Sequence, residues 1–330
     1  MIIPRTFWFD LVGGKTGQLE LFDEYFLPRA SFHVFTVLSL TTLSVLRGFS
    51  KLKLVLFLMF FSSTTNIGIS WFFLYGLGWG IKGAAYGTIV SHILTFLIAF
   101  GFLLKEKDMG FSFLSASTGK ANWLKFGKNS IDLFGRSFTL TACFFIATRL
   151  ASRLGVESLG AHQVLLQIWL LASFFLDGLA ISGNILGARF YFADQFKRTG
   201  IAFKKLLDLG FLVGVAFTVL YLLAWDPIIG LFTEDQMVLA KMKEIKWIIV
   251  GSQIISAVAF VFDGLIFGLD GFHWLRKHMM LGALLVFLPL SLVSLYHPSL
   301  HWIWLGLVLL NAYRGTTGFL FVQKKVWKKA

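Results

Sequence analysis

The chain of 330 residues is 57% hydrophobic and 17% aromatic, yet only 14% of its residues are charged. Soluble globular domains are roughly half apolar and about a quarter charged, so this chain has too few charges to cover a water-facing surface. The composition excludes a soluble enzyme, a disordered tail and a free-standing nucleic-acid module. It predicts an all-α membrane protein that crosses the bilayer several times.

Nine apolar runs, each bounded by charged residues or glycine, predict transmembrane helices. In chain order the predicted spans are 24–47, 54–76, 80–104, 128–152, 159–188, 203–225, 245–269, 275–296 and 301–323. Helices are required because a lipid-exposed backbone must satisfy its own hydrogen bonds, and the alternation typical of a β-barrel is absent. Pro28 and Pro289 lie near predicted span ends, where proline is tolerated.

The net charge of +13 is concentrated in every second loop between the spans. These loops and the C-terminal end hold Arg47, Lys51, Lys53, Lys105, Lys107, Lys120, Lys125, Lys128, Arg189, Lys197, Arg198, Lys204, Lys205, Arg276, Lys277, Lys324, Lys325, Lys328 and Lys329. The positive-inside rule therefore places these loops and the C-terminus in the cytoplasm, with residue 1 outside. We expect a multi-pass protein of the inner (cytoplasmic) membrane that contacts anionic lipid and binds no nucleic acid.

Cofactor and metal chemistry find no support in the sequence. Cys143 is the only cysteine and lies in an apolar run, which excludes disulfides and cysteine-built metal sites. His297 and His301 have helical spacing, but Pro298 between them breaks the helix that a metal pair would need. The nucleotide-binding and hydrolase motifs are also absent. We expect no enzyme activity and no cofactor.

A short internal similarity predicts the domain organisation. Residues 47–53 resemble residues 270–276, and each segment follows a long span at the predicted cytoplasmic face. Only one predicted span precedes the first segment, 47–53, whereas four predicted spans lie between the inter-lobe loop and the second segment, 270–276. The difference predicts a two-lobe transporter of six plus six helices that lacks its first three. We expect 1–119 to form a partial N-lobe with three spans and the inter-lobe loop, and 120–330 to form a C-lobe with six spans.

Polar side chains recur inside two of the spans, where they are costly and tend to face a cavity or a partner. The span 159–188 carries a polar stripe, and 245–269 carries a second acidic position; the residues are Gln163, Gln167, Asp177, Asn184 and Asp263. A carboxylate in an internal cavity can take up a proton or a sodium ion, which makes Asp177 and Asp263 candidates for cation coupling. Each could instead be a structural carboxylate that is hydrogen-bonded near a helix end or paired with a base.

Other spans carry a further tier of polar residues. Asp132 and Arg136 are spaced i, i+4, and we expect them to neutralise each other beside the cavity and to fix a helix contact. Asn66 belongs to a polar patch that helix–helix hydrogen bonds explain about as well as ion binding does. Arg314 in the last span is expected to snorkel to the interface or to close a cytoplasmic gate.

Several of these segments together resemble one transporter family. Residues 153–167, with Ala161-His162-Gln163, run on to Leu176-Asp177-Gly178 and resemble the multidrug and toxic compound extrusion (MATE) family. Residues 129–136 resemble its DinF-like branch. Phe262-Asp263-Gly264 resembles the tenth helix of the family, and Asn66 with the glycines after it resembles the fifth and sixth. The resemblance covers essentially the whole chain, from the end of the third helix to the twelfth.

The resemblance implies a MATE-type antiporter that exports organic, often cationic or xenobiotic, compounds against H+ or Na+ as the coupling ion. It implies that Asp263 and Asn66 take part in cation coupling. Ser70 departs from the pattern because the family has an aspartate there, and the first helix, with the branch's principal protonatable aspartate, is missing. Two alternatives stay open: a lipid-linked oligosaccharide flippase of the same superfamily, and a non-transporting truncated remnant. We expect a monomer.

Overall fold

The computed structural model describes residues 19–49, 51–105 and 120–329. Eight helices of this part are long and apolar enough to cross a membrane, or nine if a bent helix pair counts as one span. Each of the nine predicted spans overlaps one of them, so the prediction of an all-α polytopic membrane protein is confirmed. The chain divides into an N-terminal unit, 1–117, and a C-terminal unit, 118–330. Most of the predicted inter-lobe loop, including Lys107, lies outside the described residues.

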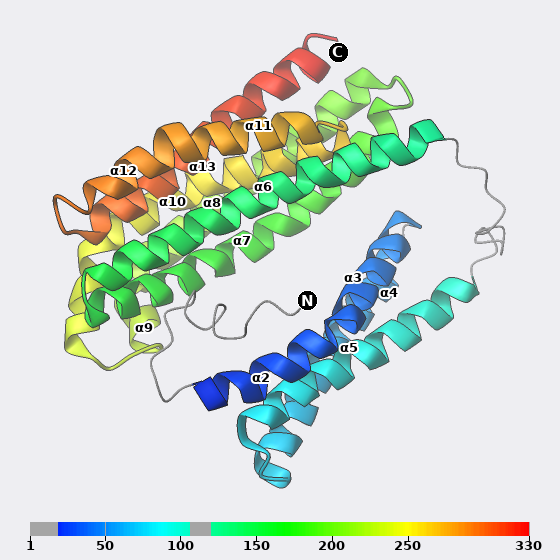
Figure 1. The fold of residues 1–330 in the computed structure, drawn as a ribbon. Coiled ribbons are helices and arrows are strands. Elements are labelled where there is room, and N and C mark those ends of the chain that lie inside the picture. The colour runs from blue at the N-terminus through cyan, green and yellow to red at the C-terminus, as the bar shows by residue number, and fades with distance from the viewer. Residues whose placement is uncertain (1–18, 50, 106–119, 330) are drawn as a thin grey trace. The chain divides into compact units, whose positions relative to one another are not determined.

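The N-terminal unit is a small helical bundle, drawn in blue to cyan in Figure 1. Its elements are α2 (Leu19–Ser31), α3 (His33–Gly48), α4 (Leu52–Trp71), the π-helical turn η1 (Phe72–Gly76) and α5 (Gly80–Leu104). Helix α5 packs against α2, α3 and α4. The core of the N-terminal unit is made of small and medium apolar side chains, namely Leu43, Leu46, Val55, Leu58, Ala99 and Leu103.

The first predicted span is one helix by sequence but two in the structure. Helices α2 and α3 meet at Phe32 with a bend of 50°. Pro28 lies inside α2, and the helix continues past it for three residues before it ends at Ser31. The amide of Phe35 bonds the carbonyl of Phe32 at 3.1 Å, which closes a tighter turn than an α-helix makes. The bend therefore lies after the proline, at the Ser31–His33 junction.

The C-terminal unit holds the longer helices, drawn in green to red in Figure 1. Its elements are α6 (Lys120–Arg153), α7 (Val156–Tyr191), α8 (Phe196–Leu223), α9 (Trp225–Gly230), α10 (Gln236–Gly268), α11 (Phe272–Gly282), η3 (Ala283–Phe287), α12 (Leu288–Val293), α13 (Leu300–Val322) and η4 (Gln323–Trp327). Helix α10 is the most buried of the candidate spans and packs against α7, α8 and α13. It therefore positions the polar residues that it carries at the centre of this unit.

Close packing of α10 depends on glycines, as is common where transmembrane helices approach each other. A Cβ atom on Gly264 would lie 2.2 Å from the carbonyl oxygen of Ala180 in α7, and one on Gly268 would lie 2.7 Å from the carbonyl oxygen of Asn184. On the α8 side, a Cβ on Gly214 would lie 3.0 Å from Ile254 Cα. Backbone thus meets backbone, and side chains cannot be added without separating the helices.

Replacing Gly264 by Ala is therefore expected to destabilise the chain, whereas Gly251→Ala on the same helix is not. The Gly264 methyl group would overlap the α7 backbone, and overpacking of this kind costs about 1–3 kcal/mol or more. At Gly251 no atom lies within 4 Å of an added Cβ, so the better helix propensity of alanine should contribute up to about 1 kcal/mol of stability. Thermal unfolding of both variants in detergent compares them directly, and equal midpoints would contradict the packing argument.

The predicted span 275–296 is one continuous helix to Val293, but its hydrogen bonding changes from α to π in the middle. The π-helical turn η3 directly precedes Pro289, which lies in the first turn of α12. Proline has no amide hydrogen and its ring crowds the carbonyl four residues earlier, so the helix widens just before it. Pro289 lies four residues before the end of the span at Val293, as expected, and the π-helical turn before it is the local adjustment that accommodates it.

Candidate functional site

Asp263 is the centre of a buried ion-pair cluster between three helices. It extends from α10, and its Oδ2 atom accepts hydrogen bonds from Nη2 of Arg136 on α6 and from Nη2 of Arg314 on α13, the latter at 2.5 Å. The side chains of Asp263 and Arg314 are only 8% and 4% exposed, and that of Arg136 is 16% exposed. Burial at this level makes the pairing obligatory, because an unpaired charge would be costly there.

The cluster continues as a chain of hydrogen bonds into the core. Arg314 donates through Nη1 to Oδ1 of Asn311 at 2.6 Å, and Asn311 donates through Nδ2 to Ser256 Oγ at 3.2 Å. The indole Nε1 of Trp169 donates to the same Ser256 hydroxyl at 3.1 Å. We call these six residues, Arg136, Asp263, Arg314, Asn311, Ser256 and Trp169, the polar network. It joins α6, α7, α10 and α13.

Two arginines share one carboxylate in the polar network, so the cluster holds one more positive than negative charge. Aromatic rings cover the guanidinium groups: Arg136 lies over Phe267 at 5.2 Å, and Arg314 lies over Phe260 at 5.3 Å. The negative faces of these rings stabilise the cations where water is scarce.

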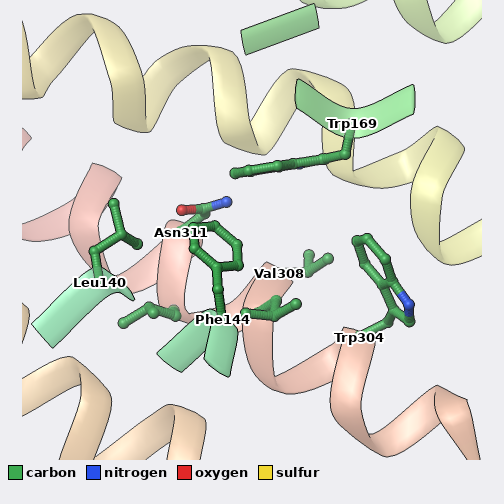
Figure 2. Close-up of a pocket in the computed structure, with 8 residues that line it drawn as sticks. Leu140, Phe144, Trp169, Trp304, Val308 and Asn311 are labelled. Atoms are coloured by element: carbon green, nitrogen blue, oxygen red, sulfur yellow. The ribbon is translucent and has the colours of Figure 1, made fainter. Parts of the chain in front are cut away.

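Two small cavities flank the polar network, each with a volume of about 10 Å³. That is the space for about one water molecule. The first cavity is mostly apolar, and Figure 2 shows Trp169 of α7, Asn311 of α13 and Phe144 of α6 among the side chains that line it. The second is lined by Arg136, Asp263, Arg314, His278 and Thr317 among others. Asp263 therefore has both arginine partners and a small void beside it.

Asp132 does not pair with Arg136, contrary to the sequence-based expectation. Asp132 is buried and contacts α11 instead, where Nε of Arg276 lies 2.9 Å from its Oδ1 and Nδ1 of His273 lies at 3.7 Å. The i, i+4 spacing puts both side chains on the same side of α6, but each has a stronger partner on a neighbouring helix. Correct spacing did not make an ion pair.

A second polar contact lies next to Asp132 at the same end of α6. Asp270, in the turn after α10, accepts from Nδ2 of Asn129 at 3.0 Å, and Nζ of Lys125 lies 2.6 Å from its Oδ2. Its φ of 58° is the left-handed conformation that aspartate tolerates better than most residues. With Asp132, this residue ties the predicted cytoplasmic end of α6 to the α10–α11 turn.

The polar stripe of α7 lies on the face that the C-terminal unit leaves uncovered. Gln163, Gln167, Asp177 and Asn184 are all exposed in this unit, while the opposite face carries the buried Leu165 and other core residues. Within the described residues, Asp177 makes neither an ion pair nor a hydrogen bond. The structure therefore separates the two predicted acidic positions: Asp263 is directly paired with Arg136 and Arg314 inside the bundle, whereas Asp177 is exposed in this unit and interacts with those arginines only at a distance.

Asn66 lies in the N-terminal unit, where it is half-buried between α4 and α5. Its Nδ2 donates to Oγ1 of Thr88 at 3.0 Å. One turn further along α4, Ser70 lies against Gly87, where an added Cβ would come within 2.3 Å of the serine hydroxyl. This patch joins the two helices.

Arg314 was expected at the interface or a gate, and the structure corrects this by burying it against Asp263. Its spacing of three from Asn311 was visible in the sequence, and the bond between them follows that spacing. Ser256 has a weaker signal, since it lies two helical turns before Asp263 on the same side of the predicted span, and Trp169 has none, because tryptophan is common in apolar spans. Among the described residues, no group of three His, Cys, Asp or Glu side chains could hold a metal ion.

Comparisons with known proteins agree on one family. A family model described as MatE matches residues 133–296. The chain is 31% identical to Protein DETOXIFICATION 43 of Arabidopsis thaliana over 283 residues, which cover 86% of this chain and 53% of that protein. It is 24% identical to DNA damage-inducible protein F of Escherichia coli (strain K12) over 323 residues, which cover 96% of this chain and 69% of that protein.

A solved structure matches the fold closely. The crystal structure of MATE in complex with MaL6 superposes with a TM-score of 0.87 at 17% identity, covering 99% of this chain and 74% of that chain. The likeness at this identity shows a common arrangement of helices. The chain spans about half the length of the Arabidopsis relative that it matches.

Proposed function

Because the chain belongs to the MATE family, we propose that it forms part of a secondary active transporter of the inner (cytoplasmic) membrane, with its C-terminus in the cytoplasm. The transporter exports small organic or xenobiotic compounds, often cationic, in exchange for H+ or Na+. The name of the Arabidopsis relative, DETOXIFICATION, is consistent with export of unwanted compounds. Residues 1–119 supply the partial N-lobe and 120–330 the C-lobe of the two-lobe design.

The observation that carries this proposal is Asp177, a carboxylate in the middle of a membrane-spanning helix that makes neither an ion pair nor a hydrogen bond among the described residues. A carboxylate inside the bilayer without a directly bonded partner is expensive even where Arg136 and Arg314 act on it at a distance, and residues of this kind commonly mark an ion or substrate pathway. A bound proton or sodium ion would remove that cost. We therefore place the coupling ion at Asp177, with Gln163, Gln167 and Asn184 on the same face as the polar lining.

Asp263 receives a different role in this proposal. A proton or sodium ion would have to compete with two guanidinium groups for its carboxylate. Asp263 therefore fixes the helices that surround the transport path, and coupling passes through Asp177 and, in the N-lobe, Asn66. The ion gradient can drive export only if the two conformations of the transporter bind the ion with different affinities.

The flippase alternative gains no support from this geometry. A lipid-linked pyrophosphate would need free cationic side chains in the path, and the mid-span arginines Arg136 and Arg314 both contact Asp263. Ion-coupled export of an organic compound agrees better with a mid-span carboxylate, Asp177, that has no hydrogen bond or ion pair among the described residues.

Accumulation of ethidium in cells that lack their own drug exporters tests the proposal. We expect cells that express this chain, alone or joined to any coding sequence found upstream of Met1, to accumulate less ethidium than cells with an empty vector. A protonophore should abolish the difference if H+ is the coupling ion, and a sodium ionophore should do so if it is Na+. Equal ethidium accumulation in cells with the chain alone, cells with the extended chain and cells with the empty vector would refute export, provided that the protein is present in the membrane.

A further inference from the structure

An open groove of about 520 Å³ lies at the N-terminal end of α8. Its lining consists of one face of α8 and the ring of Trp327 in η4, and the residues are Lys197, Gly200, Ile201, Lys204, Leu207, Asp208 and Trp327. Helix α8 and η4 pack against each other, and Nζ of Lys329 lies 5.1 Å from the ring centre of Phe196. The groove is therefore built from two segments far apart in the sequence that both belong to the C-terminal unit.

The groove lies at the depth of lipid headgroups. Helix α8 has 28 residues and is therefore about 42 Å long at about 1.5 Å per residue, which exceeds the roughly 30 Å of hydrocarbon in a bilayer. About 20 residues counted back from the end of α8 at Leu223 cross the hydrocarbon, so the membrane–water boundary lies near Lys204, with Lys197 on its aqueous side and Leu207 at the edge of the hydrocarbon. Tryptophan prefers this boundary, which agrees with the position of Trp327.

The charge around the groove is strongly positive. Residues 194–208 and 323–329 contain eight basic residues against the two acidic ones, Asp194 and Asp208. Lys197 and Lys204 are seven residues apart and lie on the same face of α8, two turns from each other. Both are exposed, and Asp208 at the inner end is the one acidic residue of the lining. An anionic ligand is therefore attracted to the outer part of the groove.

The rest of the lining is apolar. Ile201 lies between the two lysines along α8, and Leu207 lies beyond Lys204. The half-buried Trp327 forms the opposite wall. A free phosphate would leave this surface in water, whereas a molecule with an anionic head and a hydrocarbon tail would cover it. Basic pockets at the membrane surface recognise lipid headgroups in the same way.

We propose that this groove binds an anionic phospholipid of the adjacent leaflet. The headgroup phosphate lies between Lys197 and Lys204, and an acyl chain runs along Ile201, Leu207 and Trp327. The bound lipid would fill the gap between α8 and η4 and join the C-terminal end of the chain to the bundle. This proposal is independent of the transport activity, because none of its residues belongs to the polar network or to the α7 stripe.

Native mass spectrometry of the purified chain in detergent tests the proposal. The protein is titrated with dioleoyl-phosphatidylglycerol and, in parallel, with dioleoyl-phosphatidylcholine, and the dissociation constant of the first retained lipid is measured. The test variant is Lys197→Gln with Lys204→Gln. The matched control is Lys324→Gln with Lys325→Gln, which removes the same charge from two exposed lysines that do not line the groove.

We expect the chain to retain phosphatidylglycerol in preference to phosphatidylcholine. The affinity for phosphatidylglycerol should fall by about 30-fold in the test variant, since each basic residue near an anionic lipid contributes about 1 kcal/mol. The control should bind like the unmodified chain. Equal losses in both variants would show general surface attraction and overturn the proposal, and so would unchanged binding in the test variant. Displacement of the lipid by inorganic phosphate alone would overturn the role of the acyl chain.

Discussion

Replacing Asp263 by Asn is expected to lower the free energy of unfolding of this chain by about 3–5 kcal/mol, because it leaves two buried guanidinium groups without their counter-ion. The amide is nearly isosteric, so the loss reports the charge and not the volume. Arg314→Gln should cost more than Arg136→Gln, since Arg314 is the more buried and also bonds Asn311. Unfolding of the purified variants in detergent, followed by tryptophan fluorescence, measures all three.

A surface ion pair on the same helix provides the control for this prediction. Lys241 and Glu244 lie 2.9 Å apart and are well exposed, so Glu244→Gln should change stability by about 0–1 kcal/mol. If the charge argument is right, Asp263→Asn combined with Arg314→Gln should be less destabilised than the sum of the two single variants. Stability of Asp263→Asn equal to that of Glu244→Gln would show that the cluster contributes little.

In contrast to Asp263→Asn, which is expected to lose stability, Asp177→Asn is expected to keep its stability and to lose ion-coupled export. The side chain makes no hydrogen bond or ion pair among the described residues, so its neutralisation should leave the midpoint of thermal unfolding nearly unchanged. If Asp177 holds the coupling ion, ethidium export should fall to the level of the empty vector, because an amide cannot be charged and discharged. Asp177→Glu, which keeps the carboxylate, should retain part of the activity.

Glu157→Gln is the matched control for Asp177. It removes a carboxylate from the same helix, but from its exposed first turn outside the apolar sequence. Export by this variant should equal that of the unmodified chain. Full export by Asp177→Asn would assign coupling to other residues, and a loss of folded protein in that variant would show that Asp177 has a structural partner.

The number and position of the helices could be predicted because they follow from length and hydropathy alone. A bilayer needs about 20 apolar residues for each crossing, and each predicted run overlaps one candidate span, which for the first run is the bent pair α2 and α3. The bend at Phe32 and the π-helical turn before Pro289 could not be predicted in this way. Both are local changes of hydrogen bonding inside an apolar sequence, and hydropathy does not report them.

The composition of the candidate site was only partly predictable. Asp263 and Arg136 were identified as polar residues inside spans, but their partners depend on how helices distant in sequence pack together. Asp132 illustrates the limit: four residues separate it from an arginine, and it nevertheless pairs with Arg276 across a helix interface. Ser256 and Trp169 acquire their importance only because they share a hydrogen bond in the core.

The ion pair between Arg136 and Asp263 has a consequence for the order of events during synthesis. The two residues are separated by 127 positions in the chain. At about 5–20 residues per second, the ribosome needs about 6–25 s to make the aspartate after the arginine. An arginine at the centre of an inserting helix costs about 2.5–3.5 kcal/mol during that interval. We therefore expect helix α6 to remain beside the translocon, shielded from the bulk bilayer, until α10 emerges.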